Sequence, residues 1–441
     1  MEISQKTEFR KRHLGLFNMK VELIKKTLFF LGAGFSSEAG CLTSGGMFAD
    51  LKKKILSDDD GFTATEKEAL QFLISCMAYH AEWRSIKTGG EIEFNPNIEE
   101  LVLLIRRIKN REVFLPYPIT GNWADKLVEL ETDYKKQDRN NLFEELEMKL
   151  KSLLKKQWLN YDKNKIGYFD PLREFFQGHS SQDFRLDVCT LNNDLVIEKY
   201  FHNHNEIPWR GFYNGKWIGI DEEDKLDEFG RINLYKLHGS IDWVRVESGE
   251  IYEETKFPEE EKEHIEPFHN PYVIFGQGSK TISVEPFFSL MKKFNELLRS
   301  KKYIFVIGYS FFDPYINNLL FYASKGFNKL IIVNPKFGPK RIYNSENSKT
   351  IDFDESDFFR IKYPNGTNPK DLEVYIKNIQ KDSFFSELPE YNYTDIIAQN
   401  IDFIPLETST FIEKYFAKKG ELLLNFIEKY EKEMKDYEEP F

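Results

Sequence analysis

A glycine-containing stretch near the N-terminus, TLFFLGAGFSSEAG at residues 27–40, has the residue types that could cradle a phosphate. A short apolar run that suits one buried strand passes at Gly32 into small residues, and then into Ser36, Ser37 and Glu38, which could open a helix. A strand, a glycine turn and a helix start, in this order, are what a phosphate-binding loop requires. The glycines could instead serve only tight packing of a helix on a strand, and the stretch alone leaves both interpretations open.

Polar side chains of other kinds follow three more apolar runs. Asn192 and Asp194 lie in TLNND, His238 begins HGS, and Asp313 closes GYSFFD. A histidine titrates near neutral pH and can accept a proton, whereas an amide can hold water without adding charge. Each residue also has a structural alternative: an Asx turn or N-cap for Asn192 and Asp194, a satisfied core histidine for His238, and a helix cap for Asp313.

The elements that would position these residues are short runs of β-branched and aromatic residues. They are TLFFLG, RLDVCTL, INLYKLHG, PYVIFG, YIFVIGYS and KLIIVN, which begin at Thr27, Arg185, Ile232, Pro271, Tyr303 and Lys329. Continuous apolar runs suit strands that are buried on both faces of a parallel sheet, and ligands bind beyond the carboxyl ends of such strands. The sequence therefore predicts an α/β fold with a doubly wound, mostly parallel sheet, in which five strand ends meet at one crevice.

Helical patterns fill the long interval between the first two predicted strands, and no ordinary crossover is that long. The sequence predicts a discontinuous α/β core at residues 1–46 and 183–340, with an inserted, mainly helical subdomain at 47–182. Residues 341–441 are expected to form a partly helical C-terminal extension for assembly or regulation. There, Gly420 is expected to separate or kink two amphipathic helices, whose apolar faces pack on their own domain or on another subunit.

Five motifs in a fixed order, GAGFS, TLNND, HGS, GYSFFD and IIVNP, resemble the sirtuin-like NAD-binding family. The resemblance is closest to the bacterial branch associated with anti-phage defence, and it covers residues 27–335 discontinuously. It implies a sirtuin-like variant of the Rossmann fold. It also implies that Asn192 positions the attacking water, that His238 is the general base, and that Asp194 orients their loop or contacts the nicotinamide side. Asp313 is implied to stabilise a loop.

The resemblance further implies which residues hold NAD. They are, for the pyrophosphate, Gly32, Ala33, Gly34 and Ser36, and, for the adenosine half, Gly308, Ser310 and Asn334. Nicotinamide leaves from a ground state that already carries positive charge, so its departure needs no strong acid and no pair of carboxylates at glycosidase spacing.

Three features depart from the pattern of protein-deacylating sirtuins. These carry a four-cysteine zinc ribbon, whereas Cys41, Cys76 and Cys189 are too far apart to form one, so no zinc is expected. Asn193 takes an aromatic or aliphatic position, and Thr43 stands where proline is common. The leading hypothesis is therefore hydrolysis of NAD, as substrate, to nicotinamide and ADP-ribose by a regulated effector that depletes cellular NAD.

Other functions remain open at this point. A sirtuin-type protein deacylase or ADP-ribosyltransferase is one, and a non-catalytic sensor of NAD or nucleotide is another. A dehydrogenase is weaker, because GAGFSSEAG lacks the full G-x-G-x-x-G spacing. His202 and His204 could share a metal ion, but no second ligand pair has convincing spacing, and a polar loop is the simpler interpretation.

The amino-acid composition indicates which kinds of partner the protein could bind. With 72 acidic and 61 basic side chains the formal net charge is -11, so direct attraction to nucleic acid is not expected. No apolar run approaches a membrane span, and the sparse cysteines fit a reducing cytoplasm. The resemblance implies a homo-oligomer, activated by a phage component or by an ATPase, helicase-like or Argonaute-like defence protein.

Overall fold

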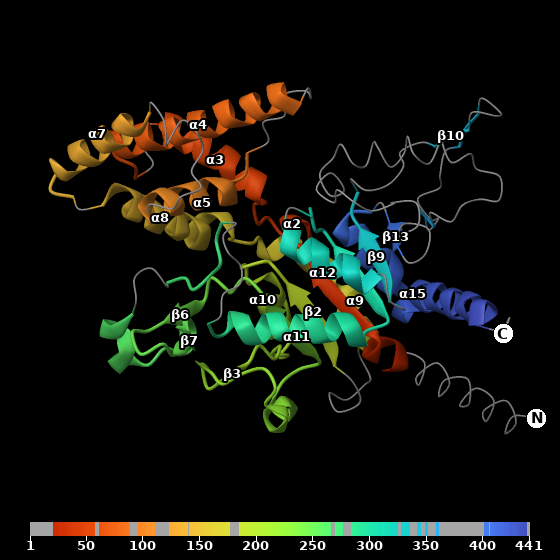
Figure 1. The fold of residues 1–441 in the computed structure, drawn as a ribbon. Helices are drawn as coiled ribbons and strands as arrows, with labels where there is room; N and C mark the ends of the chain where they lie inside the picture. Colours follow the sequence, from red (N-terminus) through yellow and green to blue (C-terminus); the bar gives the residue numbers. More distant parts are fainter. Residues whose placement is uncertain are drawn as a thin grey trace, which may run out of the picture. The chain divides into compact units, whose positions relative to one another are not determined.

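The computed structural model (Figure 1) describes residues 21–57, 61–88, 96–110, 123–139, 141–176, 185–265, 270–276, 284–311, 313–324, 328–335, 342–344, 349–351, 359–360, 401–404 and 406–438. The chain forms two compact units. We call the first the sheet unit, which comprises Met1–Ala39, Tyr161–Leu237 and Ser283–Phe441. The second, the helical unit, comprises Gly40–Asn160 and His238–Ile282.

The sheet unit is built on a seven-stranded sheet with the order β12-β13-β9-β8-β1-β2-β5. All neighbouring strands are parallel except β12 and β13, which pair antiparallel. The chain runs from β1 through β2 to β5 in one direction and from β8 through β9 to β13 in the other. The strand order therefore reverses between β1 and β8. We call this place the switch point, and open α/β sheets bind ligands there. The strands are β1 (Thr27–Leu31), β2 (Leu186–Thr190), β5 (Ile232–Lys236), β8 (Tyr303–Ile307), β9 (Lys329–Val333), β12 (Phe359–Arg360) and β13 (Ile401–Ile404).

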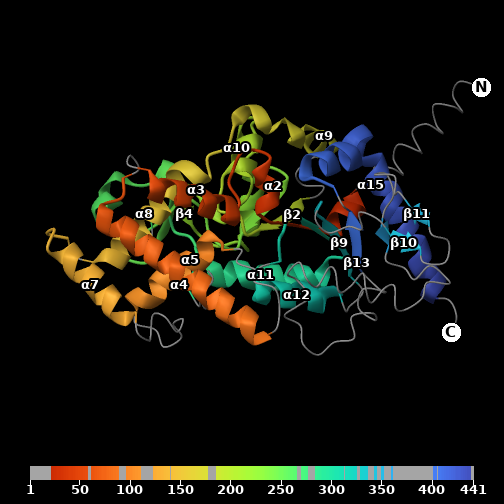
Figure 2. The ribbon, with the colours of Figure 1, turned by 90° about the horizontal axis from the view of Figure 1, so that it is seen from above.

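Helices cover both faces of this sheet (Figure 2). On one face, Phe30 of β1 stacks on Phe294 of α11, with ring centroids 5.2 Å apart. On the other, Phe29 contacts Phe416 of α15 at 5.8 Å. Successive side chains of a strand alternate between faces, so these neighbours show that β1 is buried on both sides. The predicted doubly wound, mostly parallel α/β class is confirmed. The helices include α2 (Ala33–Ser37), α9 (Asp170–Phe176), α10 (Val196–His202), α11 (Phe287–Ser300), α12 (Pro314–Ser324) and α15 (Thr408–Glu438).

Five of the six predicted strands are present, as β1, β2, β5, β8 and β9. The sixth, PYVIFG at residues 271–276, is not a strand of this sheet, and that prediction was wrong. Its backbone instead follows the segment after β5, where Tyr272 N donates to Trp243 O and Ile274 N donates to His238 O, both at 2.8 Å. Tyr272 is buried there, so the run is apolar because it packs inside the helical unit.

Residues 401–404 and 408–438, within the predicted C-terminal extension, form elements of the sheet unit. β13 extends the sheet beside β9, and the apolar face of α15 packs on the sheet through Phe411 and Phe416, whose rings meet Phe305 and Phe29. One continuous helix replaces the expected pair. It is distorted at Gly420, whose φ is +77° and where a Cβ would lie 2.4 Å from the ring of Phe175. Of the two alternatives given above, this part of the helix therefore packs on its own domain and not on another subunit.

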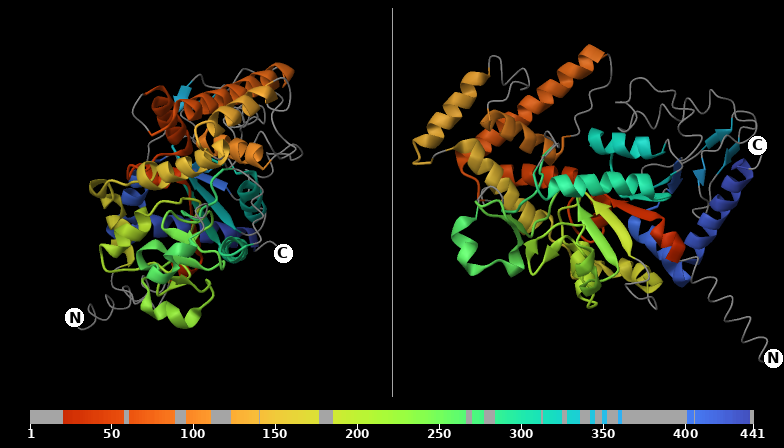
Figure 3. Two further views of the ribbon diagram at one scale, coloured as in Figure 1. Left: turned by 90° about the vertical axis from the view of Figure 1, so that its left-hand side faces the viewer. Right: turned by 60° about the horizontal axis from the view of Figure 1, so that its bottom comes forward.

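The described part of the helical unit consists mainly of long helices (Figures 1 and 3). Side chains of Thr43, Asn97 and Asn141 accept hydrogen bonds at the starts of α3, α5 and α8, so Thr43 has a capping role at its position. No helix among the described residues of either unit is long and apolar enough to cross a membrane. The elements are α3 (Ser44–Leu56), α4 (Ala64–Thr88), α5 (Ile98–Lys109), α7 (Ala124–Lys135), α8 (Leu142–Leu153), β6 (Trp243–Arg245) and β7 (Ile251–Glu253). The units divide at different residues from the predicted boundaries of 1–46, 47–182, 183–340 and 341–441.

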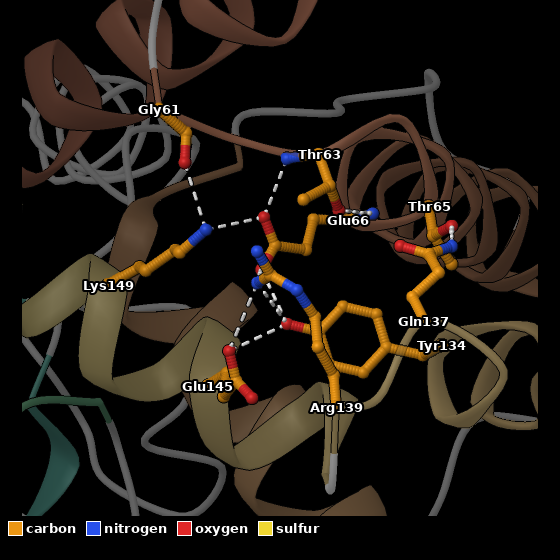
Figure 4. Close-up of polar contacts among 9 residues, drawn as sticks. All are labelled: Gly61, Thr63, Thr65, Glu66, Tyr134, Gln137, Arg139, Glu145 and Lys149. Carbon is orange, nitrogen blue, oxygen red and sulfur yellow. Dashed lines mark hydrogen bonds and ion pairs between the residues drawn. The ribbon is translucent and has the colours of Figure 1, made fainter.

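A buried carboxylate, Glu66, joins three helices of the helical unit (Figure 4). Its Oε2 accepts hydrogen bonds from Thr63 N at 2.7 Å and Lys149 Nζ at 2.6 Å, and its Oε1 lies 2.8 Å from the hydroxyl of Tyr134. Thr63 Oγ1 in turn accepts from Glu66 N at 3.2 Å, which completes a capping box at the start of α4. We call these residues, with Arg139 and Glu145, the Glu66 cluster.

Candidate functional site

The turn after β1 is packed directly against the turn after β8. Gly32 N donates to Ile307 O at 2.9 Å, and Gly34 N donates to Gly308 O at 2.8 Å. A Cβ on Gly34 would lie 2.8 Å from Gly308 O, and one on Gly308, whose φ is +63°, would lie 2.4 Å from Phe35 N. The glycines therefore serve close packing at the switch point. Both N–H groups that were expected to face the pyrophosphate bind carbonyl groups inside the protein, while Ala33 is exposed.

Asn192 is held by three hydrogen bonds at the carboxyl end of β2. Its backbone N–H binds Thr190 Oγ1 at 3.0 Å. Its amide Nδ2 donates to Gly32 O at 2.8 Å and to Ser36 Oγ at 3.1 Å. Asn192 of TLNND and Gly32 of GAGFS are 160 residues apart in the sequence, and this hydrogen bond joins them at the switch point. The buried Ser36 hydroxyl is used here, inside the protein, rather than being presented to a phosphate.

Asp194 takes the structural role that the sequence left open. Its Oδ1 accepts from Val196 N at 3.0 Å, which forms an Asx turn before α10, and it also receives a hydrogen bond from Ser36. Asp194 as a whole is 5% exposed. Burial raises its pKa, and the charge of Lys236 together with the hydrogen bonds of Val196 N and Ser36 only partly opposes that shift. Asp194 therefore fixes the loop that carries Asn192.

Charged residues behind this loop were missed by the sequence reasoning. Lys236 ends β5, is 1% exposed, and donates from Nζ to the main-chain carbonyl of Asp194. The same ammonium lies 2.7 Å from Glu198 Oε1 on α10, and Arg210 binds that oxygen at 3.0 Å. A lysine inside the apolar run INLYKLHG was the available signal, because a fully buried charge requires partners.

The other side of the switch point is formed by the turns after β8 and β9. Asn334 Nδ2 donates to Tyr309 O at 3.0 Å, which ties the end of β9 to the turn containing Gly308. Ser310 in this turn is exposed. Asp313 Oδ1 accepts from Tyr315 N at 3.1 Å, so Asp313 caps α12 just before Pro314, as its structural alternative proposed. Gly308, Ser310 and Asn334 thus lie at the edge where the sequence placed them.

His238 follows β5 by two residues and is the first residue of the second segment of the helical unit. It is buried, and its carbonyl accepts from Ile274 N at 2.8 Å. His202 and His204 lie at the C-terminal end of α10, where His204 Nδ1 contacts Tyr200 O at 2.9 Å. Among the residues that the structure describes, no group of three or more His, Cys, Asp or Glu could hold a metal ion.

Comparison with known proteins agrees with part of this picture. Residues 187–350 match the family model of the SIR2-like domain. Among solved structures, a triple mutant of a Sir2 homologue in complex with 2'-O-acetyl ADP ribose is similar at 13% identity and a TM-score of 0.35, over 93% of this chain and 96% of that one. A Sir2 homologue in complex with NAD is similar at 16% identity and a TM-score of 0.31, over 73% of this chain and 83% of that one. The comparison with curated proteins finds no match. Residues 187–350 are therefore similar to the SIR2-like domain, and the fold class of the chain is defined by its own strand order.

Proposed function

We propose that the protein is an NAD glycohydrolase, which cleaves the bond between nicotinamide and ribose and releases nicotinamide and ADP-ribose. The observation that carries the proposal is the anchored amide of Asn192 at the switch point of a SIR2-like domain. Because Nδ2 already binds Gly32 O and Ser36 Oγ, the oxygen Oδ1 is the end of the amide that can accept a hydrogen bond from water.

Cleavage of the bond between nicotinamide and ribose requires few catalytic groups. The water oxygen bonds to the anomeric carbon of the ribose as the bond from that carbon to the nicotinamide nitrogen breaks, and the leaving nicotinamide becomes neutral. The sequence motifs TLNND and HGS support the two roles: Asn192 orients the water, and His238 accepts its proton, a step worth roughly a hundred- to ten-thousand-fold in rate. Gly308, Ser310 and Asn334 are proposed to line the adenosine half, with Ala33 beside the pyrophosphate.

The proposal extends to a biological setting, supported by the sequence motifs. The enzyme would be a regulated defence effector that works as a homo-oligomer and depletes NAD when a phage component or a partner protein activates it. The partner would be an ATPase, helicase-like or Argonaute-like protein. The net charge of -11 favours contact with nucleic acid through such a partner.

The test is to incubate the purified chain with NAD, with and without candidate activators, and to quantify nicotinamide and ADP-ribose. We expect Asn192→Ala and His238→Ala to lower kcat by about a hundredfold or more. Asn203→Ala and His202→Ala are matched controls, because both side chains are exposed at the end of α10, and they should keep wild-type turnover.

Three results would contradict the proposal. Wild-type protein that binds NAD but releases no nicotinamide under any activating condition would be a sensor. Nicotinamide release that requires an acylated peptide would identify a deacylase. Full turnover in either Asn192→Ala or His238→Ala would reject the role of that residue.

A further inference from the structure

We propose that Lys236 is a positioning residue, which acts through Asp194 and Ser36 to hold the amide of Asn192 in place. The inference rests on the proposed function for its effect on turnover, and on geometry alone for its effect on the loop. Lys236, Glu198 and Arg210 lie behind the TLNND loop, and none of the three has a place in the chemistry described above.

The connection from Lys236 to Asn192 passes through successive hydrogen bonds within the sheet unit. The Lys236 ammonium donates to the main-chain oxygen of Asp194, and the Asp194 carboxylate receives the hydroxyl of Ser36. Ser36 Oγ then accepts from Asn192 Nδ2 at 3.1 Å. Each bond in this chain is buried or half-buried, so a shift of Asp194 is transmitted to the amide with little competition from water.

Burial of the Lys236 ammonium makes its contacts necessary for stability. An ammonium that is 1% exposed loses its hydration, and Glu198 at 2.7 Å together with the carbonyl of Asp194 must replace it. The same charge favours the ionised form of Asp194, against the effect of burial on the pKa of that carboxyl. Replacing Lys236 by an apolar residue would therefore release the main chain at Asp194 and weaken the ionised carboxylate that Ser36 binds.

The experiment compares Lys236→Met with Lys329→Met. Lys329 is also a buried lysine of this sheet, but it is the first residue of β9, at the edge opposite the site. In the NAD assay, we expect Lys236→Met to lower kcat by about a hundredfold, as a displacement near 1 Å does, with KM within about threefold of wild type. We expect Lys329→Met to keep the wild-type kcat even where it lowers the melting temperature.

A second measurement does not depend on activity. Hydrogen exchange followed by mass spectrometry should show faster exchange in residues 191–196 for Lys236→Met, and unchanged exchange there for Lys329→Met. If Lys236→Met does not fold, the double variant Lys236→Met/Glu198→Gln is measured in its place, because it removes both charges of this ion pair and leaves an amide oxygen that can still accept from Arg210.

The outcomes separate this inference from the proposed function. Wild-type protein without NAD hydrolysis rejects the proposed function, while the exchange measurement still tests the positioning role. Unchanged exchange in the loop, or a wild-type kcat in Lys236→Met, would overturn the inference. A loss of kcat equal in Lys236→Met and Lys329→Met would also overturn it, because that result indicates general destabilisation.

Discussion

Asp194 in the sheet unit and Glu66 in the helical unit are both buried carboxylates with a lysine close by, yet their pKa values move in opposite directions. Burial alone raises the pKa of both. For Glu66, hydrogen bonds from Lys149, Thr63 and Tyr134 and the charge of Lys149 outweigh burial, so its pKa is lowered. For Asp194, burial prevails.

The difference lies in what each ammonium touches. Lys149 Nζ binds the carboxylate of Glu66 directly, at 2.6 Å. Lys236 Nζ binds the main-chain carbonyl of Asp194 and forms its ion pair with Glu198, so only its field reaches the Asp194 carboxylate. Proximity of a cation is therefore not enough to stabilise a buried carboxylate. The Glu66 cluster stabilises a fold, whereas the Asp194 contacts place a loop at some cost in stability.

The largest expected effect on stability is that of Glu66→Ala. This change removes a capping box and leaves buried polar partners without their acceptor, so the free energy of unfolding should fall by about 3 kcal/mol. Urea unfolding measures it. Glu68→Ala is the control on the same helix, since Glu68 is 55% exposed in its ion pair with Lys126, and it should change stability by less than about 0.5 kcal/mol. Equal midpoints for the two variants would show that the Glu66 cluster does not stabilise the unit.

Neutral isosteres test the opposite pKa shifts themselves. The lowered pKa of Glu66 gives stability that is present above its ordinary value of 4.5 and is lost as pH falls through the folded value. Glu66→Gln should therefore destabilise the protein by about 1–3 kcal/mol at pH 7, and the difference from wild type should shrink in acid.

Asp194→Asn should behave in the reverse sense. A raised pKa gives a contribution that is present below the ordinary value of 3.8 and is lost as pH rises through the folded value. At pH 7 the ionised carboxylate is thus held less favourably in the folded chain than in the unfolded chain, and Asp194→Asn should be as stable as wild type or more stable. A loss of stability at pH 7 equal to that of Glu66→Gln would contradict the opposite pKa shifts of the two carboxylates.

The smallest effects are expected from removing one hydroxyl beside each carboxylate. Ser36→Ala and Tyr134→Phe should each lower the free energy of unfolding by about 1 kcal/mol in urea unfolding. Their activities should differ, because Ser36 also holds Asn192, whereas the hydroxyl of Tyr134 binds Glu66, Glu145 and Arg139 within the Glu66 cluster. Nicotinamide release should fall in Ser36→Ala and stay at the wild-type level in Tyr134→Phe. Equal activities would remove Ser36 from the positioning contacts.

Much of the sheet could be predicted because its strands are continuous apolar runs. Phe29 and Phe30 are both buried, on opposite faces, and that is the pattern which distinguishes a covered parallel strand. PYVIFG has the same pattern for another reason, since Tyr272 is buried against other parts of the helical unit. An apolar run indicates that a segment is buried, but it does not indicate which part of the protein covers it.

The site was predictable in its residues and less so in their roles. Asn192 and Gly32 meet at the switch point because both follow parallel strands, and parallel strands end at the same edge. The N–H groups of Gly32 and Gly34 were assigned to a phosphate, but they bind the carbonyl groups of the last residue of β8 and of the residue after it, since the two turns pack against each other. Glycine permits close approach, and the sequence does not tell whether a ligand or the backbone approaches.

The sequence by itself determined where five strands of the sheet lie along the chain, which residue types follow them, and a set of motifs that resembles the sirtuin-like family. Those properties are local, because they depend on periodicity and on which residue follows which strand. Only the tertiary structure decided that Lys236 binds the carbonyl of Asp194 while Lys149 binds the carboxylate of Glu66. The reason is physical: a buried charge interacts over a few ångströms, so its effect depends on which acceptor the fold brings within reach.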